Sequence, residues 1–67
     1  MSNNNFLKIG KQIKALRISK KYTQVKLAML LCISREHLSE IERGVTFPSV
    51  KLLYKIIEQT GGSITID

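Results

Sequence analysis

The stretch QVKLAMLLCISREHLSEIER, from Gln24 to Arg43, determines the fold that we expect for this chain. Its apolar side chains recur at helical spacing, with the small Ala28 between them: Leu27, Leu31, Ile33, Leu38 and Ile41. Thr23 and Ser34 are good N-cap residues, and each stands directly before one half of the stretch. The pattern therefore predicts two short amphipathic helices, over residues 24–31 and 35–43, joined across Cys32 and Ile33.

Two further helical patterns flank this pair. The first is predicted from Phe6 to Ser19, and its apolar stripe consists of Phe6, Ile9, Ile13 and Leu16. The second follows the N-cap Ser49 and ends at about Thr60, with its inward side chains predicted to be Val50, Leu53, Ile56 and Ile57. Gly44 and the pair Gly61–Gly62 are the expected helix terminators. Leu7 and Ile18 fall off the first stripe and are candidates for contact with a partner.

Two short helices joined by a tight turn are the layout of a helix-turn-helix, in which one helix braces another that can enter the DNA major groove. The expected fold class is all-α, a compact bundle of four to five helices. Residues 1–5 are expected to form a flexible tail, residues 6–61 the helix-turn-helix domain, and residues 62–67 a separate tail.

The end of the chain predicts a different structure. Residues 63–67, SITID, alternate polar and apolar side chains and are rich in β-branched residues, which is typical of a strand. A lone strand lacks partners for its backbone groups, and no second strand is predicted. We therefore expect an antiparallel ribbon between two copies, formed by Ile64, Thr65 and Ile66, and hence a homodimer.

The charge distribution points to a polyanion. The net charge is +6, and no acidic residue occurs before Glu36. Nucleic acid is the leading candidate and an anionic membrane surface the second. Cys32 is the single cysteine, so no intrachain disulfide is possible, which fits a reducing cytosol. No metal-ligand spacing, cofactor motif, signal peptide or bilayer-length apolar run is present, so we expect a cytoplasmic protein without cofactors.

Three segments carry a resemblance to a known family: IGKQIKALR, YTQVKLAMLLCISREHLSEIERG and FPSVKLLYKII. From Ile9 to Gly61 the chain resembles the Cro/cI-type helix-turn-helix family, also called the XRE family. The resemblance implies a lambda-repressor-like bundle, a dimer and a transcriptional regulator. Two features depart from the family pattern. Cys32 replaces the usual turn glycine, which costs roughly 1 kcal/mol if its backbone is left-handed. The strand-like tail resembles that of some antitoxins paired with kinase toxins.

The predicted DNA contacts lie on the two central helices and the following loop. A wheel places the polar side chains of residues 35–43 outward, and Arg35 can bind guanine while Glu36 can accept from cytosine. The resemblance places Ser34 and Ser39 near base edges, and assigns phosphate contacts to Gln24 and Arg43. The full predicted set is Thr23, Gln24, Ser34, Arg35, Glu36, His37, Ser39, Arg43 and Thr46.

Other residues are assigned structural roles. In the family, an arginine late in the first helix commonly pairs with a glutamate late in the third, which here implies a structural ion pair between Arg17 and Glu42. Tyr22, Phe47 and Tyr54 are interpreted as packing residues or loop anchors, although Phe47 is also a candidate for contact with a dimer partner.

Several functions are compatible with these features. The first is a dimeric, sequence-specific regulator, expected to be a repressor of double-stranded operator DNA. The second is an antitoxin that also binds a protein toxin, with a restriction-modification controller as a close alternative. The third is an interaction module that has lost DNA binding. An enzyme is the least favoured, because His37 is the sole histidine and no catalytic set of residues is present.

Overall fold

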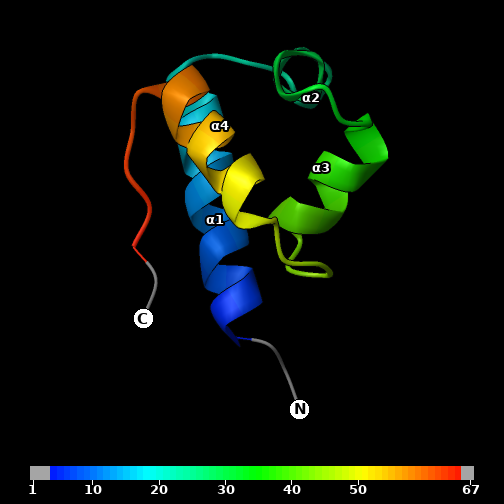
Figure 1. The fold of residues 1–67 in the computed structure, drawn as a ribbon, viewed down its shortest axis with the longest axis vertical. Helices are drawn as coiled ribbons and strands as arrows, with labels where there is room; N and C mark the ends of the chain where they lie inside the picture. The colour runs from blue at the N-terminus through cyan, green and yellow to red at the C-terminus, as the bar shows by residue number, and fades with distance from the viewer. Residues whose placement is uncertain (1–3, 66–67) are drawn as a thin grey trace.

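The computed structural model describes residues 4–65 and contains four helices. In chain order they are α1 (Asn4–Ser19), α2 (Gln24–Leu31), α3 (Arg35–Glu42) and α4 (Val50–Thr60). Helices α1 and α4 lie side by side, and α2 and α3 pack on one side of that pair (Figure 1). The prediction of an all-α bundle with a helix-turn-helix is confirmed. None of the described helices has the length and apolar character needed to cross a bilayer.

Side-chain caps set where three of the helices begin. Thr23 Oγ1 accepts from the backbone N–H of Lys26 at 3.0 Å, and Ser34 Oγ accepts from that of His37 at 3.0 Å. Ser49 Oγ caps α4 in the same way. Each hydroxyl satisfies an amide in the first turn that has no partner within the helix. The predicted starts of α2, α3 and α4 are therefore correct, each for the expected reason.

Left-handed backbone conformations end the helices. Cys32 adopts φ 60° and ψ 40° after α2, while Gly44 and Gly61 have φ values of 77° and 67° after α3 and α4. Glycine is suited to this region because it has no Cβ. At Gly44 the lack of a side chain also allows close packing, because a Cβ there would lie 2.9 Å from the Cα of Leu7. Only Cys32 of these three carries steric strain.

The core is formed by apolar residues from all four helices. Its buried side chains are Ile9, Ile13, Leu27, Ala28, Leu31, Leu38, Ile41, Leu52, Leu53 and Ile56. Tyr22, Ile33 and Phe47 pack against this cluster, and the rings of Phe6 and Phe47 lie 5.0 Å apart. Gly10 brings α1 against the end of α3, since a Cβ there would come 2.6 Å from the carbonyl oxygen of Glu42. Helix α3 is thus held firmly on its inner side.

Some boundaries and orientations differ from the predictions. Helix α1 begins at Asn4, two residues earlier than predicted, so residues 4 and 5 are helical; the remaining predicted tail, residues 1–3, lies outside the described residues. Helix α3 ends at Glu42, and Arg43 caps it. Val50, predicted to face inward, is exposed, because the buried side of α4 is formed by Leu52, Leu53 and Ile56. Tyr54, interpreted as a packing residue, is exposed as well.

The predicted C-terminal strand is wrong for the part of it that the structure describes. Residues 61–65 have no strand conformation and run back alongside the bundle (Figure 1). Thr65 N–H donates to Gln12 Oε1 at 2.8 Å, and Gln12 Nε2 donates to the Thr65 carbonyl oxygen at 2.8 Å. Ile64 packs against the core. One side-chain amide therefore supplies the pairing that a neighbouring strand would have provided. Ile66 lies outside the described residues.

Candidate nucleic-acid interface

The inner end of α3 is anchored by a buried carboxylate. Glu42 has a side chain that is 3% exposed, and its Oε2 accepts from Arg17 Nε at 2.8 Å. Its Oε1 accepts from Arg17 Nη2 at 3.2 Å, so the contact is bidentate. Arg17 also donates through Nη1 to the carbonyl oxygen of Tyr22 at 2.9 Å. The ion pair implied by the family resemblance is present, and it ties α1, the loop before α2, and α3 together.

Gln24 extends this network to the first turn of α3. Its Nε2 donates to Glu42 Oε1 at 3.1 Å, while its Oε1 accepts from Arg35 Nη1 at 3.2 Å. The amide therefore connects the last residue of α3 to the first. Sequence reasoning assigned Gln24 a phosphate contact, but it did not identify this bridge. No local pattern reveals it, because Gln24 and Glu42 belong to different helices and meet only in the folded bundle.

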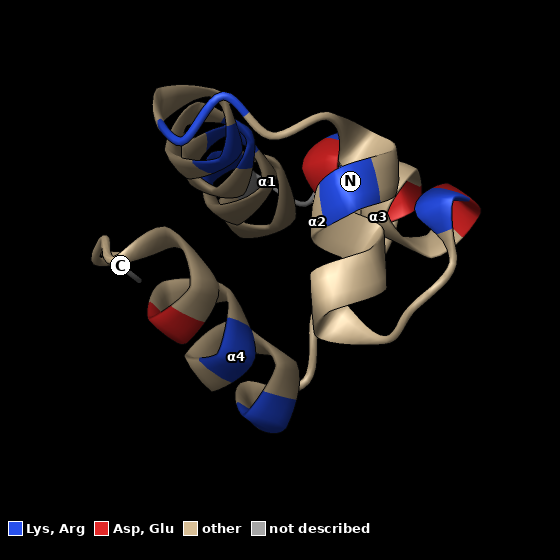
Figure 2. Ribbon diagram, turned by 90° about the horizontal axis from the view of Figure 1, so that it is seen from above, with Lys and Arg blue, Asp and Glu red and all other residues tan. Residues whose placement is uncertain are grey.

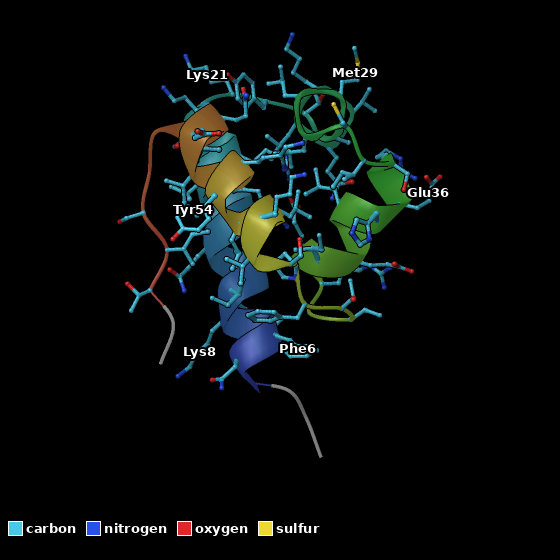
Figure 3. The ribbon with its side chains drawn as sticks, viewed as in Figure 1. Phe6, Lys8, Lys21, Met29, Glu36 and Tyr54 are labelled. Atoms are coloured by element: carbon cyan, nitrogen blue, oxygen red, sulfur yellow. The ribbon has the colours of Figure 1, made fainter. Side chains whose placement is uncertain are left out.

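The outer edge of α3 is polar and open to solvent at its first turn. The side chain of Arg35 is 49% exposed and that of Glu36 is 77% exposed, and the two approach each other at 3.9 Å. Glu36 projects from the outer end of α3, away from the bundle (Figure 3). Arg35 has five N–H donors, of which one is held by Gln24. Because the side chain is half exposed, its other donors are accessible to an acceptor from outside the protein.

The remaining predicted contacts are distributed around this edge. Thr23 and Ser34 are exposed caps of α2 and α3, and the backbone N–H of half-buried His37 is held by Ser34. Farther along α3, Arg43 Nε donates to Ser39 Oγ at 3.3 Å, which places an exposed guanidinium one helical turn beyond Ser39. Thr46 lies half-buried in the loop after α3, and the structure does not link it to the others.

The outer edge of α3 has both acidic and basic side chains, whereas every charged side chain of α1 is basic. Lys8, Lys11 and Lys14 are exposed on α1, and the acidic residues of the described chain lie on α3 and α4 (Figure 2). No group of three or more potential metal ligands occurs within residues 4–65. The arrangement can therefore donate hydrogen bonds to an acceptor at α3, while the lysines of α1 contribute a separate positive surface.

A short helix held by its inner face, with a polar outer edge and a braced first turn, defines a helix-turn-helix protein. The family model described as "Helix-turn-helix" matches residues 13–66. The chain belongs to this family.

Relatives of known name share the sequence and the fold. The immunity repressor protein of Bacillus phage phi105 is 40% identical over 53 residues, which is 79% of this chain. The chain spans 37% of the length of that repressor. Among solved structures, the restriction-modification controller protein C.AhdI from Aeromonas hydrophila is similar with a TM-score of 0.81 and 26% identity, over 87% of this chain and 88% of that one.

A second solved structure is that of the master regulator for biofilm formation SinR, in complex with DNA. It is similar with a TM-score of 0.75 and 34% identity, and the match covers 82% of this chain and 92% of that chain. The named relatives are thus regulators, and the match to two of them extends over most of both chains.

Proposed function

We propose that this chain is a sequence-specific DNA-binding transcriptional regulator, acting as a repressor in the cytoplasm. The observation that carries the proposal is the first turn of α3, where Arg35 and Glu36 are open to solvent while the opposite face of the helix is fixed in the core. A helix presented in this way can enter the major groove without rearrangement of the bundle. The DNA complex of the regulator SinR supports the same role.

Within this proposal, Arg35 reads guanine and Arg43 contacts phosphate. Arg35 already has one donor fixed by Gln24, so its guanidinium plane is oriented before DNA arrives. Arginine binds guanine O6 and N7 through two parallel hydrogen bonds, which requires such an orientation. Its contact with Glu36 is long, at 3.9 Å, and both side chains are exposed, so exchange for a base edge costs little. Glu36 would accept from a neighbouring cytosine.

We further propose that two copies bind together. The molecule measures 32 × 23 × 20 Å, whereas half-sites of an operator lie about one helical turn, roughly 34 Å, apart. One copy therefore reads one half-site, and a near-palindromic operator requires a dimer.

Selection of bound duplexes from a random pool tests the proposal. We expect an enriched near-palindromic site whose affinity falls steeply with salt, because lysine and arginine side chains displace counterions from phosphates. Enrichment of no sequence, with no duplex bound even at low salt, would refute DNA binding and favour an interaction module that keeps the fold alone.

The variants Arg35→Ala and Arg43→Ala distinguish a contact to a base from a contact to a phosphate. Arg35→Ala should relax the preference at one base pair by roughly 1–3 kcal/mol, because a bidentate base contact is lost. Arg43→Ala, at the residue that caps the C-terminal end of the same helix, is the matched control and should weaken binding to all duplexes about equally. Affinities of both variants for the selected site and its single-base changes measure this difference. Uniform weakening by Arg35→Ala would make Arg35 a phosphate contact.

A restriction-modification controller is the second candidate function. The observation in its favour is the match to C.AhdI, which covers 88% of that chain as well as most of this one. An endonuclease gene beside the gene for this chain would support it. The antitoxin alternative stays a prediction, and the tail strand that suggested it is not found within residues 61–65.

A further inference from the structure

A polar cleft lies between α4 and the turn that joins α2 to α3. Its volume is about 280 Å³, close to the lower end of the range for small-molecule sites in proteins. The buried Leu31 and Leu52 contribute apolar surface to it, and the polar side chains around them are His37, Ser49, Lys51 and Lys55. None of the described residues that line this cleft is acidic. Apolar surface with a few convergent polar groups is typical of a site for a small ligand. We call it the α4 cleft.

The basic side chains of the α4 cleft have no partner in the described part of the chain. Lys51 and Lys55 lie about one helical turn apart on the same face of α4, where like charges repel each other. Neither forms an ion pair within residues 4–65, and Glu58 on the same helix pairs with neither of them. The imidazole of His37 makes no hydrogen bond within the same residues. The cleft thus holds donors and positive charge that the fold itself does not use.

We propose that the α4 cleft binds a small phosphorylated molecule, with its phosphate between Lys51 and Lys55. Lysine attracts phosphate as a compact point charge, whereas bidentate recognition of a carboxylate favours arginine, and no arginine is among the described residues that line the cleft. Ser49 can supply a further bond. Its Oγ accepts from the Leu52 N–H, and its hydroxyl proton remains available to a phosphate oxygen. Leu31 and Leu52 contact the apolar part of the ligand.

The α4 cleft is separate from the edge of α3 that we assign to DNA. Of the predicted DNA contacts, which all belong to the described residues, His37 alone lines the cleft. At about 3.6 residues per turn, its side chain leaves α3 about 160° around the helix axis from those of Arg35 and Ser39. A molecule bound in the cleft therefore leaves Arg35 accessible. The site follows from the cleft and its charges, and it does not depend on the proposed function.

Titration of the full chain with phenyl phosphate, followed by amide chemical shifts, tests the assignment. We expect saturable shifts at Cys32, Ile33 and His37 and in the first turns of α4. Inorganic phosphate should shift the same amides and bind ~10-fold more weakly, because it offers no apolar group to Leu31 and Leu52. Phenol, which lacks the phosphate, should produce none of these shifts. Binding of phenol as tight as that of phenyl phosphate would overturn the assignment of a phosphate site.

Removal of charge shows whether the cleft or a general attraction holds the phosphate. The double variant Lys51→Gln with Lys55→Gln should raise the dissociation constant of phenyl phosphate at least ~10-fold, because two charge-assisted hydrogen bonds are lost. The matched control is Lys11→Gln with Lys14→Gln, which removes the same charge from exposed positions on α1. Because salt screens distant charges, the control should stay within ~2-fold of the wild type. Circular dichroism verifies that both variants are folded. Equal losses in both would show non-specific attraction and overturn the site.

Addition of a duplex distinguishes a small ligand from the DNA backbone. With the selected duplex at saturation, phenyl phosphate should bind as it does to the free protein. The small-ligand assignment is overturned if the duplex displaces phenyl phosphate and if Lys51→Gln with Lys55→Gln weakens duplex binding more than the α1 control does, because the cleft is then a contact to a DNA phosphate. If no duplex binds while phenyl phosphate still shifts the amides of the cleft, the proposed function is refuted and the ligand site stands.

Discussion

Two sets of side-chain hydrogen bonds tie distant segments of this protein together, and they differ in burial and charge. In the first set, Arg17 and Gln24 bind the carboxylate of Glu42, whose side chain is 3% exposed, and these bonds join three helices. In the second set, the neutral amide of Gln12 binds the backbone of Thr65 at the surface of α1. Both use bonds of similar length. Water competes for the second set and is excluded from the first.

The buried contacts hold the fold together, whereas the exposed contacts only place a segment on it. A buried carboxylate must keep its partners, because leaving it unpaired carries the full cost of removing a charge from water. An exposed amide that loses its partner forms hydrogen bonds with water instead. The orientation of α3 therefore depends on the first set, and only the course of residues 61–65 depends on the second.

The largest expected effect is that of Arg17→Ala. It removes both hydrogen bonds from Arg17 to Glu42 and should destabilise the protein by about 3–5 kcal/mol, which is comparable to the whole stability of a domain this small. Chemical unfolding followed by circular dichroism measures the loss. The double variant Arg17→Met with Glu42→Leu should recover much of it, because no charge is left buried. A midpoint unchanged by Arg17→Ala would contradict the importance assigned to this pair.

Gln24 gives a second and smaller test of the buried network. Gln24→Glu would place a carboxylate where the amide now donates to Glu42 at 3.1 Å, so two like charges would share a nearly dry site. We expect a loss of about 2 kcal/mol or more, whereas Gln24→Ala, which leaves Glu42 with Arg17, should cost about 1 kcal/mol. The same unfolding assay ranks the two variants. An equal effect of both would show that the site is open to water.

The sequence predicted the first of these regions far better than the second. Helical periodicity and the caps Thr23, Ser34 and Ser49 are local signals, and they located α2, α3 and α4 correctly. The resemblance to a family supplied the pairing of Arg17 with Glu42. Gln12 gave no such signal, because an amide on a solvent-facing helix position is ordinary, and its partner lies 53 residues away.

The errors have a common physical cause. Residues 63–65 have the β-branched pattern of a strand, yet conformation depends on which donors and acceptors lie within reach, and Gln12 was within reach. Val50 occupies a helical position that periodicity alone assigns inward, but the buried side of α4 is formed by Leu52, Leu53 and Ile56. The bridging role of Gln24 likewise required knowledge of how α2 crosses α3. Each error concerns a choice between tertiary partners, which local patterns do not encode.

Cys32 lies in the turn between α2 and α3, two of the helices that the buried network joins. Its backbone is left-handed, with φ 60°, a conformation that costs a non-glycine residue roughly 1–2 kcal/mol. Cys32→Gly should relieve this strain and lose part of the gain to backbone entropy, for a net stabilisation of at most about 1 kcal/mol. Thermal unfolding measures it. Destabilisation would mean that the thiol makes a packing contribution larger than the strain.

The smallest expected effect is that of Gln12→Ala on the exposed contact. Loss of the Gln12–Thr65 hydrogen bonds should lower the free energy of unfolding by about 0.5 kcal/mol, near the low end for a solvent-accessible hydrogen bond. The unfolding midpoint would change too little to measure this loss well. Amide hydrogen exchange is more direct, because the Thr65 N–H donates to Gln12 at 2.8 Å and should exchange at the rate of an open chain once that acceptor is removed.

Gln12→Glu is the matched control for this contact. It keeps an acceptor oxygen for the Thr65 N–H and removes the donor to the Thr65 carbonyl, so exchange should stay slower than in Gln12→Ala. Neither variant should alter the exchange of amides in α3, which is held by the buried network. Faster exchange in α3 would show that the two sets of contacts are coupled, and unchanged exchange at Thr65 in Gln12→Ala would show that the packing of Ile64 alone positions the segment.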